Sequence, residues 1–171
     1  MCQIIYFGYK LKSDILVCRL LYYVFLTLNK KYEGGSTDLS KILLQISRMN
    51  VKEIPCVDHA LKLRSAVSDS NYHSFFKLIN SAPNKSRFLC DLMLPYMRYS
   101  GLQRIHKAYR PHVCLKFVLN DLGLFDDEKY GKKWLLSCGC KLSSVNNIEV
   151  FLTKDSTIHA PTLDDVKNSL I

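Results

Sequence analysis

The sequence predicts a mostly α protein: an irregular stack of helical hairpins capped by a winged helix with a small β-hairpin. Residues 56–111 have the apolar spacing of short amphipathic helices in series. Residues 112–161 then combine helix, turn, helix and hairpin patterns in that order. The 171 residues are 48% hydrophobic and include only 7 Gly and 5 Pro, which favours a packed core over a loop-rich chain. We therefore expect a helical stack over residues 1–111, a winged-helix cap over 112–161 and a tail over 162–171.

The first helix is predicted by an apolar run over residues 15–28, with a start at Ser13-Asp14 and an end near Asn29. A bilayer requires roughly 20 apolar residues, so this run is too short to span one, and Arg19 interrupts it. We interpret it as a fully buried core helix and expect no membrane insertion. After a polar loop over 30–36, a second helix is predicted by apolar residues at helical spacing: Leu39, Ile42, Leu43 and Ile46.

A helical hairpin is predicted next. The third helix covers about residues 57–68, and the turn over 68–71 is rich in side chains that bond their own backbone. The fourth helix carries Tyr72, Phe75, Phe76 and Ile79 on one face. A fifth begins near Lys85 and is expected to kink at Pro95. Aromatic residues at helical spacing are usually core, and we assign Phe88 to the core with the others.

The cap has clear local signals. Residues 112–115 form a short strand, and a helix over 116–122 ends at Gly123, which suits a left-handed C-cap. Asp126 or Asp127 starts the next helix, which runs to about Ser137 and ends at Gly139. Residues 141–144 and 148–153 flank Asn146-Asn147, a workable hairpin turn.

The charge is strongly basic, with a formal net charge of +9 and a pI near 9.2. Residues 71–135 carry 11 Lys/Arg against 5 Asp/Glu, whereas residues 136–171 carry 3 against 4. A basic excess favours polyanionic partners, although many basic domains are merely soluble. The excess belongs to the stack and the start of the cap.

Two groups of cations are candidates for binding phosphates. Lys129, Lys132 and Lys133 fall within roughly a 100° arc of the helix over residues 127–137, the position of a recognition helix. Arg104, Lys107 and Arg110, with Lys116, form a second stripe. Each group has a simpler interpretation as a solvated helix face, which for the second stripe includes local ion pairs with Asp121. Arg64 and Arg98 are interpreted as structural anchors for carbonyls or a carboxylate between helices.

The sequence predicts no enzyme, metal, cofactor or small-molecule substrate. The neighbouring Cys56, Asp58 and His59 lack any sign that a nucleophile and its base are positioned together. The five His and seven Cys show no metal-ligand spacing, and Cys138-Gly139-Cys140 has no second pair. An odd number of cysteines without a convincing signal peptide favours a reducing compartment.

Four segments of the sequence resemble the Sac-three/GANP family: CRLLYYVF, CVDHALKLRSA, NYHSFFKLINSAP and RIHKAYRP. The resemblance covers about residues 15–153, and NYHSFF followed by a Pro-marked turn is closest to the leukocyte-receptor-cluster-member branch. It implies a TPR/PCI-like domain, stacked helices closed by a winged helix. The family domain usually begins well before the segment matching Ile15, so the stack is expected to be truncated on that side and to expose an apolar end near residues 4–28.

The resemblance implies that the protein is a non-catalytic scaffold for nuclear messenger-RNA export or processing. It also implies a location in the nucleus or at the nuclear pore, with a cytoplasmic fraction. Its implied partners are a second PCI-domain protein, a small acidic subunit, and messenger RNA or other nucleic acid. The alternative is a PCI subunit of the proteasome-lid, signalosome or initiation-factor kind, which binds proteins only and whose net charge is incidental.

Overall fold

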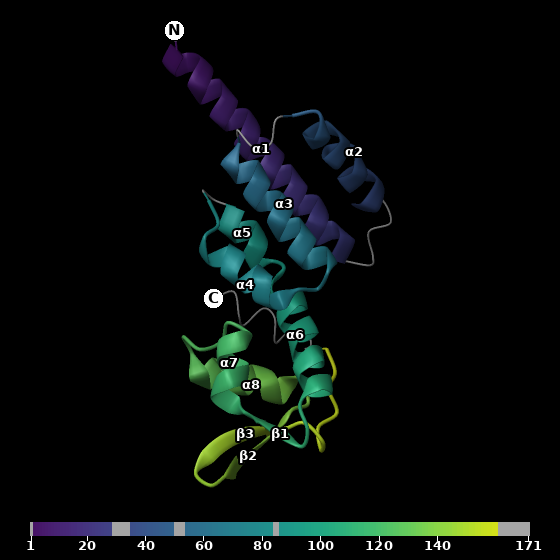
Figure 1. Cartoon of the computed structure of the whole chain (residues 1–171), viewed down its shortest axis with the longest axis vertical. Helices are drawn as coiled ribbons and strands as arrows, with labels where there is room; N and C mark the ends of the chain where they lie inside the picture. The colour runs from purple at the N-terminus through teal and green to yellow at the C-terminus, as the bar shows by residue number, and fades with distance from the viewer. Residues whose placement is uncertain (1, 29–34, 50–53, 84–85, 161–171) are drawn as a thin grey trace. The chain divides into compact units, whose positions relative to one another are not determined.

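The computed structural model describes residues 2–28, 35–49, 54–83 and 86–160, without the side chains of residues 2–11 and 35 (Figure 1). The chain packs as two compact units, Met1–Leu94 and Pro95–Ile171. The predicted tail over residues 162–171 and the first part of the predicted loop, residues 30–34, lie outside the described residues. The predicted domain boundary after Pro111 stays a prediction; by packing, the helix before it groups with the second unit.

The first unit is a stack of helices: α1 (Cys2–Leu28), α2 (Gly35–Ser47), α3 (Pro55–Ser68), α4 (Tyr72–Asn80) and α5 (Ser86–Asp91). Helix α1 packs against α2, α3 and α5, and α3 packs against α4. Burial of aliphatic side chains at helical spacing holds these helices together. In α1 to α4 the buried hydrophobic residues are Leu16, Val17, Leu20, Leu21, Val24, Leu39, Ile42, Ile46, Val57, Ala60, Leu63, Ala66, Val67, Phe75 and Ile79.

The prediction that α1 is buried on all sides is wrong for its described side chains. Leu20 and Leu21 are buried, but Ile15 is 52% exposed and Tyr22 47% exposed. The neighbouring helices cover only one face of α1, so its apolar residues continue onto the surface. The sequence predicts an exposed apolar end near residues 4–28, and α1 does expose apolar side chains in part of that range. Among the described residues no helix is long and apolar enough to cross a membrane.

The predicted hairpin of α3 and α4 is confirmed. Pro55 occupies the first turn of α3, where a missing backbone N–H costs nothing. Asn71 caps α4 by accepting a hydrogen bond from the backbone N–H of Ser74 at 3.1 Å. Only residues 69–71 separate the two helices, which forces them to lie antiparallel and in contact.

The predicted fifth helix is in fact two helices. α5 ends at Asp91, and after two intervening residues α6 (Leu94–Ala108) begins with Pro95 in its first turn. Proline kinks a helix from within but starts one easily, because the first-turn N–H has no partner inside the helix. The core assignment of Phe88 is also wrong: it is 71% exposed, and Cys90 and Met93 are buried instead.

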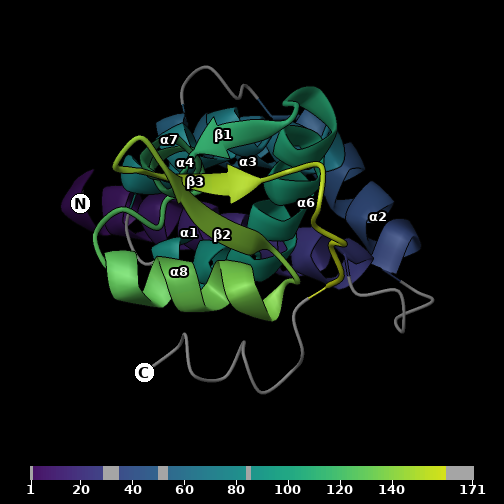
Figure 2. The same cartoon turned by 90° about the horizontal axis from the view of Figure 1, so that it is seen from below.

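The second unit is a winged helix: α6, β1 (His112–Cys114), α7 (Leu115–Asp121), α8 (Glu128–Ser137), β2 (Lys141–Val145) and β3 (Ile148–Leu152). The strands form one antiparallel sheet with β3 between β1 and β2, as Figure 2 shows from the sheet side. Thus the predicted hairpin gains a third strand. The core is built from α6, α7, α8 and the sheet, with Leu102, Ile105, Leu115, Leu119, Leu135 and Phe151 fully buried.

Local signals in this unit act as predicted. Gly123 (φ 61°) and Gly139 (φ 82°) both adopt the left-handed conformation. Asp127 caps α8 by accepting a hydrogen bond from the Tyr130 N–H at 2.9 Å. Asn146 (φ 51°) and Asn147 (φ 63°) make the tight turn of the wing, the hairpin of β2 and β3.

Candidate nucleic-acid interface

The three lysines of α8 do not share one environment. The Lys132 ammonium contacts Glu128 at 2.9 Å on the same helix and Glu149 of β3 at 2.7 Å. Its side chain is 32% exposed. Lys129 and Lys133 are exposed at the surface. Lys132 therefore joins α8 to the wing, and its charge is offset by two carboxylates.

The titration of these groups reflects the contacts. Hydrogen bonds to Glu149 and Glu128 raise the pKa of Lys132 above its ordinary value. The hydrogen bond from Lys132 and its charge lower the pKa of Glu128, and the charge of Lys116 lowers it further. Both pKa shifts favour the charged forms of Lys132 and Glu128.

The second predicted stripe lies at the end of α6. Arg104 and Lys107 are exposed residues of that helix. Arg110, just beyond it, donates from Nη1 to the Thr153 carbonyl at 2.7 Å, and Thr153 in turn bonds Pro111 through N (3.1 Å) and Oγ1 (2.9 Å). Arg110 thus anchors the segment after α6 to the end of β3, so part of its bonding capacity is used within the fold.

The six predicted residues therefore divide by geometry. Lys107, Lys129 and Lys133 present their ammonium groups at the surface, and Arg104 is exposed while making a contact within the protein. Lys132 and Arg110 hold the wing and the post-α6 segment. Whether the six bind nucleic acid stays a prediction.

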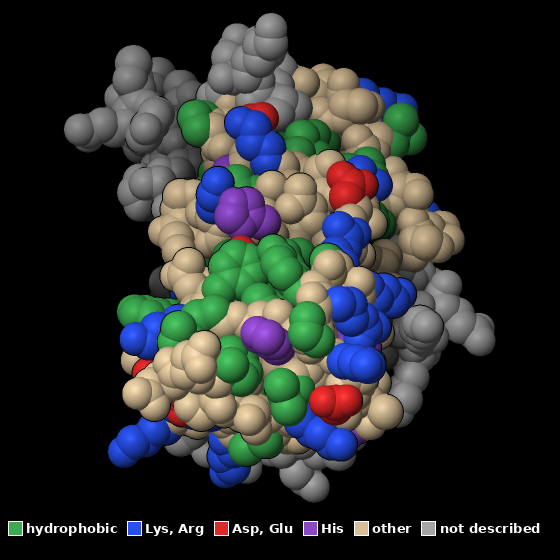
Figure 3. All heavy atoms as spheres, turned by 60° about the horizontal axis from the view of Figure 1, so that its bottom comes forward, with side chains coloured by type: hydrophobic (Ala, Val, Ile, Leu, Met, Phe, Trp, Pro, Cys, Tyr) green, Lys and Arg blue, Asp and Glu red, His purple; other side chains and the backbone are tan. Residues whose placement is uncertain are grey.

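A long stretch of sequence around the second stripe contains no acidic residue. Between Asp91 and Asp121 the sequence contains no Asp or Glu but five cations: Arg98, Arg104, Lys107, Arg110 and Lys116. The stretch covers α6, β1 and most of α7. Figure 3 shows Lys and Arg side chains on the surface beside exposed hydrophobic ones. Like charges in one stretch, without acidic neighbours in sequence, favour a polyanionic partner.

Sequence reasoning missed an aromatic pair in this stretch. Tyr109 follows α6 and Phe117 lies on α7; their ring centroids are 5.6 Å apart and their planes 62° to each other. Each residue is 41% exposed. The sequence does contain a signal for this pair, because each aromatic residue is adjacent to a cation. Tyr109 directly precedes Arg110, and Phe117 directly follows Lys116.

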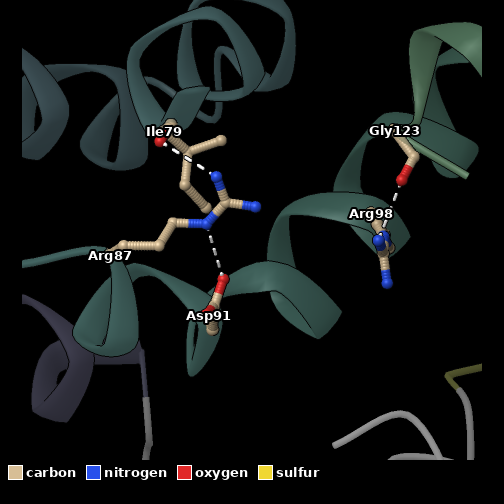
Figure 4. A network of polar contacts seen from close by, with 5 residues as sticks. All are labelled: Ile79, Arg87, Asp91, Arg98 and Gly123. Atoms are coloured by element: carbon tan, nitrogen blue, oxygen red, sulfur yellow. Dashed lines mark hydrogen bonds and ion pairs between the residues drawn. The ribbon is translucent and has the colours of Figure 1, made fainter. Parts of the chain in front are cut away.

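Arg98 acts as the structural anchor that the sequence predicts. It donates from Nε to the Leu122 carbonyl at 3.3 Å and from Nη2 to the Gly123 carbonyl at 2.9 Å, which ties α6 to the end of α7 (Figure 4). In the first unit, Arg87 bridges Asp91 and the Ile79 carbonyl (Figure 4). Arg64 differs: its Nε is buried and makes no hydrogen bond, so for this atom the anchoring interpretation fails.

The described residues contain no group of three or more His, Cys, Asp or Glu that could hold a metal ion. Cys138 and Cys140 are buried, and burial together with the charge of Cys138 raises the pKa of Cys140 to about 12. The Cys140 thiol is therefore a poor nucleophile, because its thiolate is scarce. Cys56 is half-buried, and His59 bonds the Leu78 carbonyl at 3.0 Å.

Comparison with known proteins identifies relatives for most of the chain. The model of the SAC3/GANP family matches residues 21–144. Over 111 residues the chain is 38% identical to leukocyte receptor cluster member 8 homolog of Xenopus laevis, which covers 65% of this chain and 13% of that protein. It is 30% identical to a THP3 homolog of Schizosaccharomyces pombe (85% of this chain, 34% of that protein) and 29% identical to SAC3 family protein A of Arabidopsis thaliana (71% and 14%).

No solved structure gives a significant match. The chain spans between 13% and 34% of the length of these three relatives, so it corresponds to one part of each. The family match, in contrast, extends from within α1 to within β2 and includes both units. Because it covers well over half of the sequence, this protein belongs to the SAC3/GANP family.

Proposed function

We propose that this protein is a non-catalytic scaffold subunit in nuclear messenger-RNA export or processing, which binds nucleic acid through the basic surface of its winged-helix unit. The observation that carries the proposal is the family match over residues 21–144. The matched range extends into a winged-helix unit that is rich in exposed cations. The family resemblance implies the scaffold role and the RNA pathway, and the charge of the unit supports a polyanionic partner.

The nucleic-acid part of the proposal rests on how the unit presents its charge. Lys129 and Lys133 are exposed on α8, the helix that occupies the recognition position of a winged helix. Lys132 fixes the wing to that helix through Glu149. Lysines on a helix held in this way contact phosphates without first having to order the wing. We assign the phosphate contacts to Lys129, Lys133 and Lys107, with Arg104 beside them.

The protein partners follow from the family. The proposal includes a second PCI-domain protein and a small acidic subunit, and location in the nucleus, including the nuclear pore. Exposed apolar residues support a protein-binding role: Ile15 and Tyr22 on α1, and Phe88 on α5. No catalytic step is proposed.

A second candidate is a PCI subunit that binds proteins only. The observation that favours it is the apolar surface at the edge of the winged helix, where Val145 and Ile148 at the wing tip and Leu136 on α8 are exposed. Such residues suit a protein interface better than a phosphate backbone. In this case the basic residues are solvated and the wing is an assembly edge.

A salt series distinguishes the two candidates. The purified chain is titrated with a fluorescein-labelled 12-nucleotide RNA at 50 to 300 mM salt and binding is followed by anisotropy. Phosphate contact predicts an affinity that falls log-linearly with salt. If a folded sample binds no RNA at 50 mM salt, the nucleic-acid proposal is wrong and the protein-only function is favoured.

Charge reversal then locates the surface. We expect Lys129→Glu with Lys133→Glu to abolish measurable binding at 150 mM salt. The matched control is Lys12→Glu with Lys77→Glu, which makes the same change of charge on exposed lysines of the first unit. Equal loss in both double variants would mean that net charge, rather than α8, determines binding. Lys132 is left intact because its removal also loosens the wing.

A further inference from the structure

An exposed aromatic pair lies inside the most basic stretch of the chain. The rings of Tyr109 and Phe117 pack edge to face, with centroids 5.6 Å apart, and each residue is 41% exposed. Apolar rings that only fill the core would be covered on all sides. These two stabilise each other but leave part of their surface to solvent, so they can accept another flat group.

The residues next to the pair in the sequence are positively charged. Lys107 and Arg110 lie within two residues of Tyr109, and Lys116 directly precedes Phe117. No acidic residue occurs in the sequence between Asp91 and Asp121. A surface that bound an aliphatic or an acidic protein segment would not need exposed aromatic rings and cations together. Flat rings with adjacent cations match a ligand that has flat rings and negative charges, which is the chemistry of unpaired nucleotides.

The position of the pair is fixed by the fold. Just after Tyr109, Arg110 donates to the Thr153 carbonyl at 2.7 Å, and the Pro111 carbonyl accepts from the Thr153 N–H at 3.1 Å. Phe117 lies on α7, whose neighbours Leu115 and Val118 are fully buried. Both rings are thus carried by anchored backbone, and a ligand does not have to order them on binding.

We infer that Tyr109 and Phe117 form a base-stacking platform that makes the basic surface select single-stranded over double-stranded nucleic acid. The inference rests on the proposed nucleic-acid binding and specifies its ligand. Cations attract both forms, because both carry phosphates. In a duplex the bases are stacked within the helix, whereas an unpaired base can leave its stack and lie on a side-chain ring.

The test compares three ligands of nearly equal phosphate number by anisotropy: a 12-nucleotide uridine RNA, the same backbone without bases, and a duplex RNA of six G·C base pairs. We expect the full chain to bind the uridine RNA about tenfold more tightly than the other two, a ratio typical of one stacked base. Equal binding of the uridine and base-free RNAs overturns the platform while the proposed phosphate binding stands. No binding of any ligand overturns both.

Variants assign the selectivity to the two rings. Tyr109→Leu with Phe117→Leu removes the aromatic faces and keeps apolar bulk, and should reduce binding of the uridine RNA to the level of the base-free one. The slope of affinity against salt should not change, since no cation is lost. Tyr109→Phe should retain the selectivity. Phe88→Leu, at an exposed phenylalanine of the first unit, is the matched control and should leave all three affinities unaltered.

Folding is checked by circular dichroism and thermal melting for each variant. If the folded double-leucine variant still prefers the uridine RNA by tenfold, the platform is wrong. The same conclusion follows if Phe88→Leu lowers the preference as much as the double variant does. A double variant that fails to fold is replaced by Tyr109→Leu alone, in which Phe117 remains in place.

Discussion

Lys132 lies between Lys129 and Lys133 in the sequence, yet its ammonium contacts two carboxylates whereas theirs face solvent. An exposed ion pair contributes little on its own, because solvent screens it. The contact with Glu149 has a second effect, because it attaches α8 to the wing. The hairpin of β2 and β3 extends beyond the core, and its residues 143–149 are exposed. Lys132 is thus a residue that positions the wing.

The first prediction concerns the titration of Glu128. Its pKa lies below the ordinary value of 4.5 because of Lys132, so its contribution to stability is present above pH 4.5 and is lost as the pH falls through the lowered pKa. In a Lys132→Gln variant the pKa of Glu128 should return toward 4.5. Carboxyl carbon NMR titration measures it. The same low midpoint in the variant would mean that Lys132 is not the cause.

The second prediction concerns thiol reactivity. Burial raises the pKa of Cys90 to about 11 and that of Cys140 to about 12, whereas Cys18 and Cys114 are exposed. At pH 8 iodoacetamide should alkylate Cys18 and Cys114 first, and should reach Cys90 and Cys140 only after unfolding. Peptide mass spectrometry over a time course gives the order. Rapid alkylation of Cys140 in the folded chain would contradict its burial.

At the scale of elements, the cap could be predicted well because its signals are local. Asp127 supplies a cap, Gly139 a left-handed helix end, and Asn146-Asn147 a hairpin turn, each from chemistry within a few residues. The exposure of Phe88 could not be predicted, because it depends on which neighbours cover α5. The engagement of Lys132 by Glu149 likewise joins residues 17 positions apart, which periodicity along one helix does not reveal.

The third prediction concerns how α8 packs. A Cβ on Gly131 would lie 2.5 Å from Leu119 Cδ2 and 3.2 Å from the Leu124 carbonyl oxygen, so neighbouring atoms must move. Overpacking costs about 1–3 kcal/mol, and alanine returns about 1 kcal/mol of helix propensity. We therefore expect Gly131→Ala to lower the free energy of unfolding by about 1 kcal/mol. Urea denaturation measures this change.

The control for that prediction lies two residues further along α8. Lys133 is exposed, and Lys133→Ala alters the helix without adding volume to the core. It should change the free energy of unfolding by less than about 0.5 kcal/mol, as surface substitutions usually do. If Gly131→Ala proved as stable as Lys133→Ala, Leu119 would have space to turn away and the close packing would not matter.

At the scale of the whole molecule, each unit exposes both apolar residues and cations. The first exposes Ile15 and Phe88 as well as Lys12 and Lys77, and the second exposes Ile148 and Leu136 as well as the cations of α6 and α8. The sequence predicts where the charge excess lies but not which apolar residues are exposed, because exposure of an apolar residue is a property of packing. A scaffold that exposes apolar residues and cations suits the binding of both proteins and nucleic acid.

The fourth prediction follows from this arrangement. Each phosphate contact to a single strand contributes about 0.7 to the slope of log affinity against log salt concentration. Removing the charges of Lys129 and Lys133 with glutamine should therefore reduce the slope by about 1.4. Lys12→Gln with Lys77→Gln should leave it nearly unchanged. An unchanged slope in the α8 variant would place the phosphate contacts elsewhere on the protein.

The turn of the wing also determines where this sequence can change in length. Asn146 and Asn147 reverse the chain at a point where all residues from Ser143 to Glu149 are exposed, so extra residues inserted between them would enter solvent rather than the core. Related proteins can thus lengthen this hairpin without altering the packing beneath it. For the experimenter, the same site accepts a short epitope or a dye-bearing loop, which would report directly on what approaches the wing.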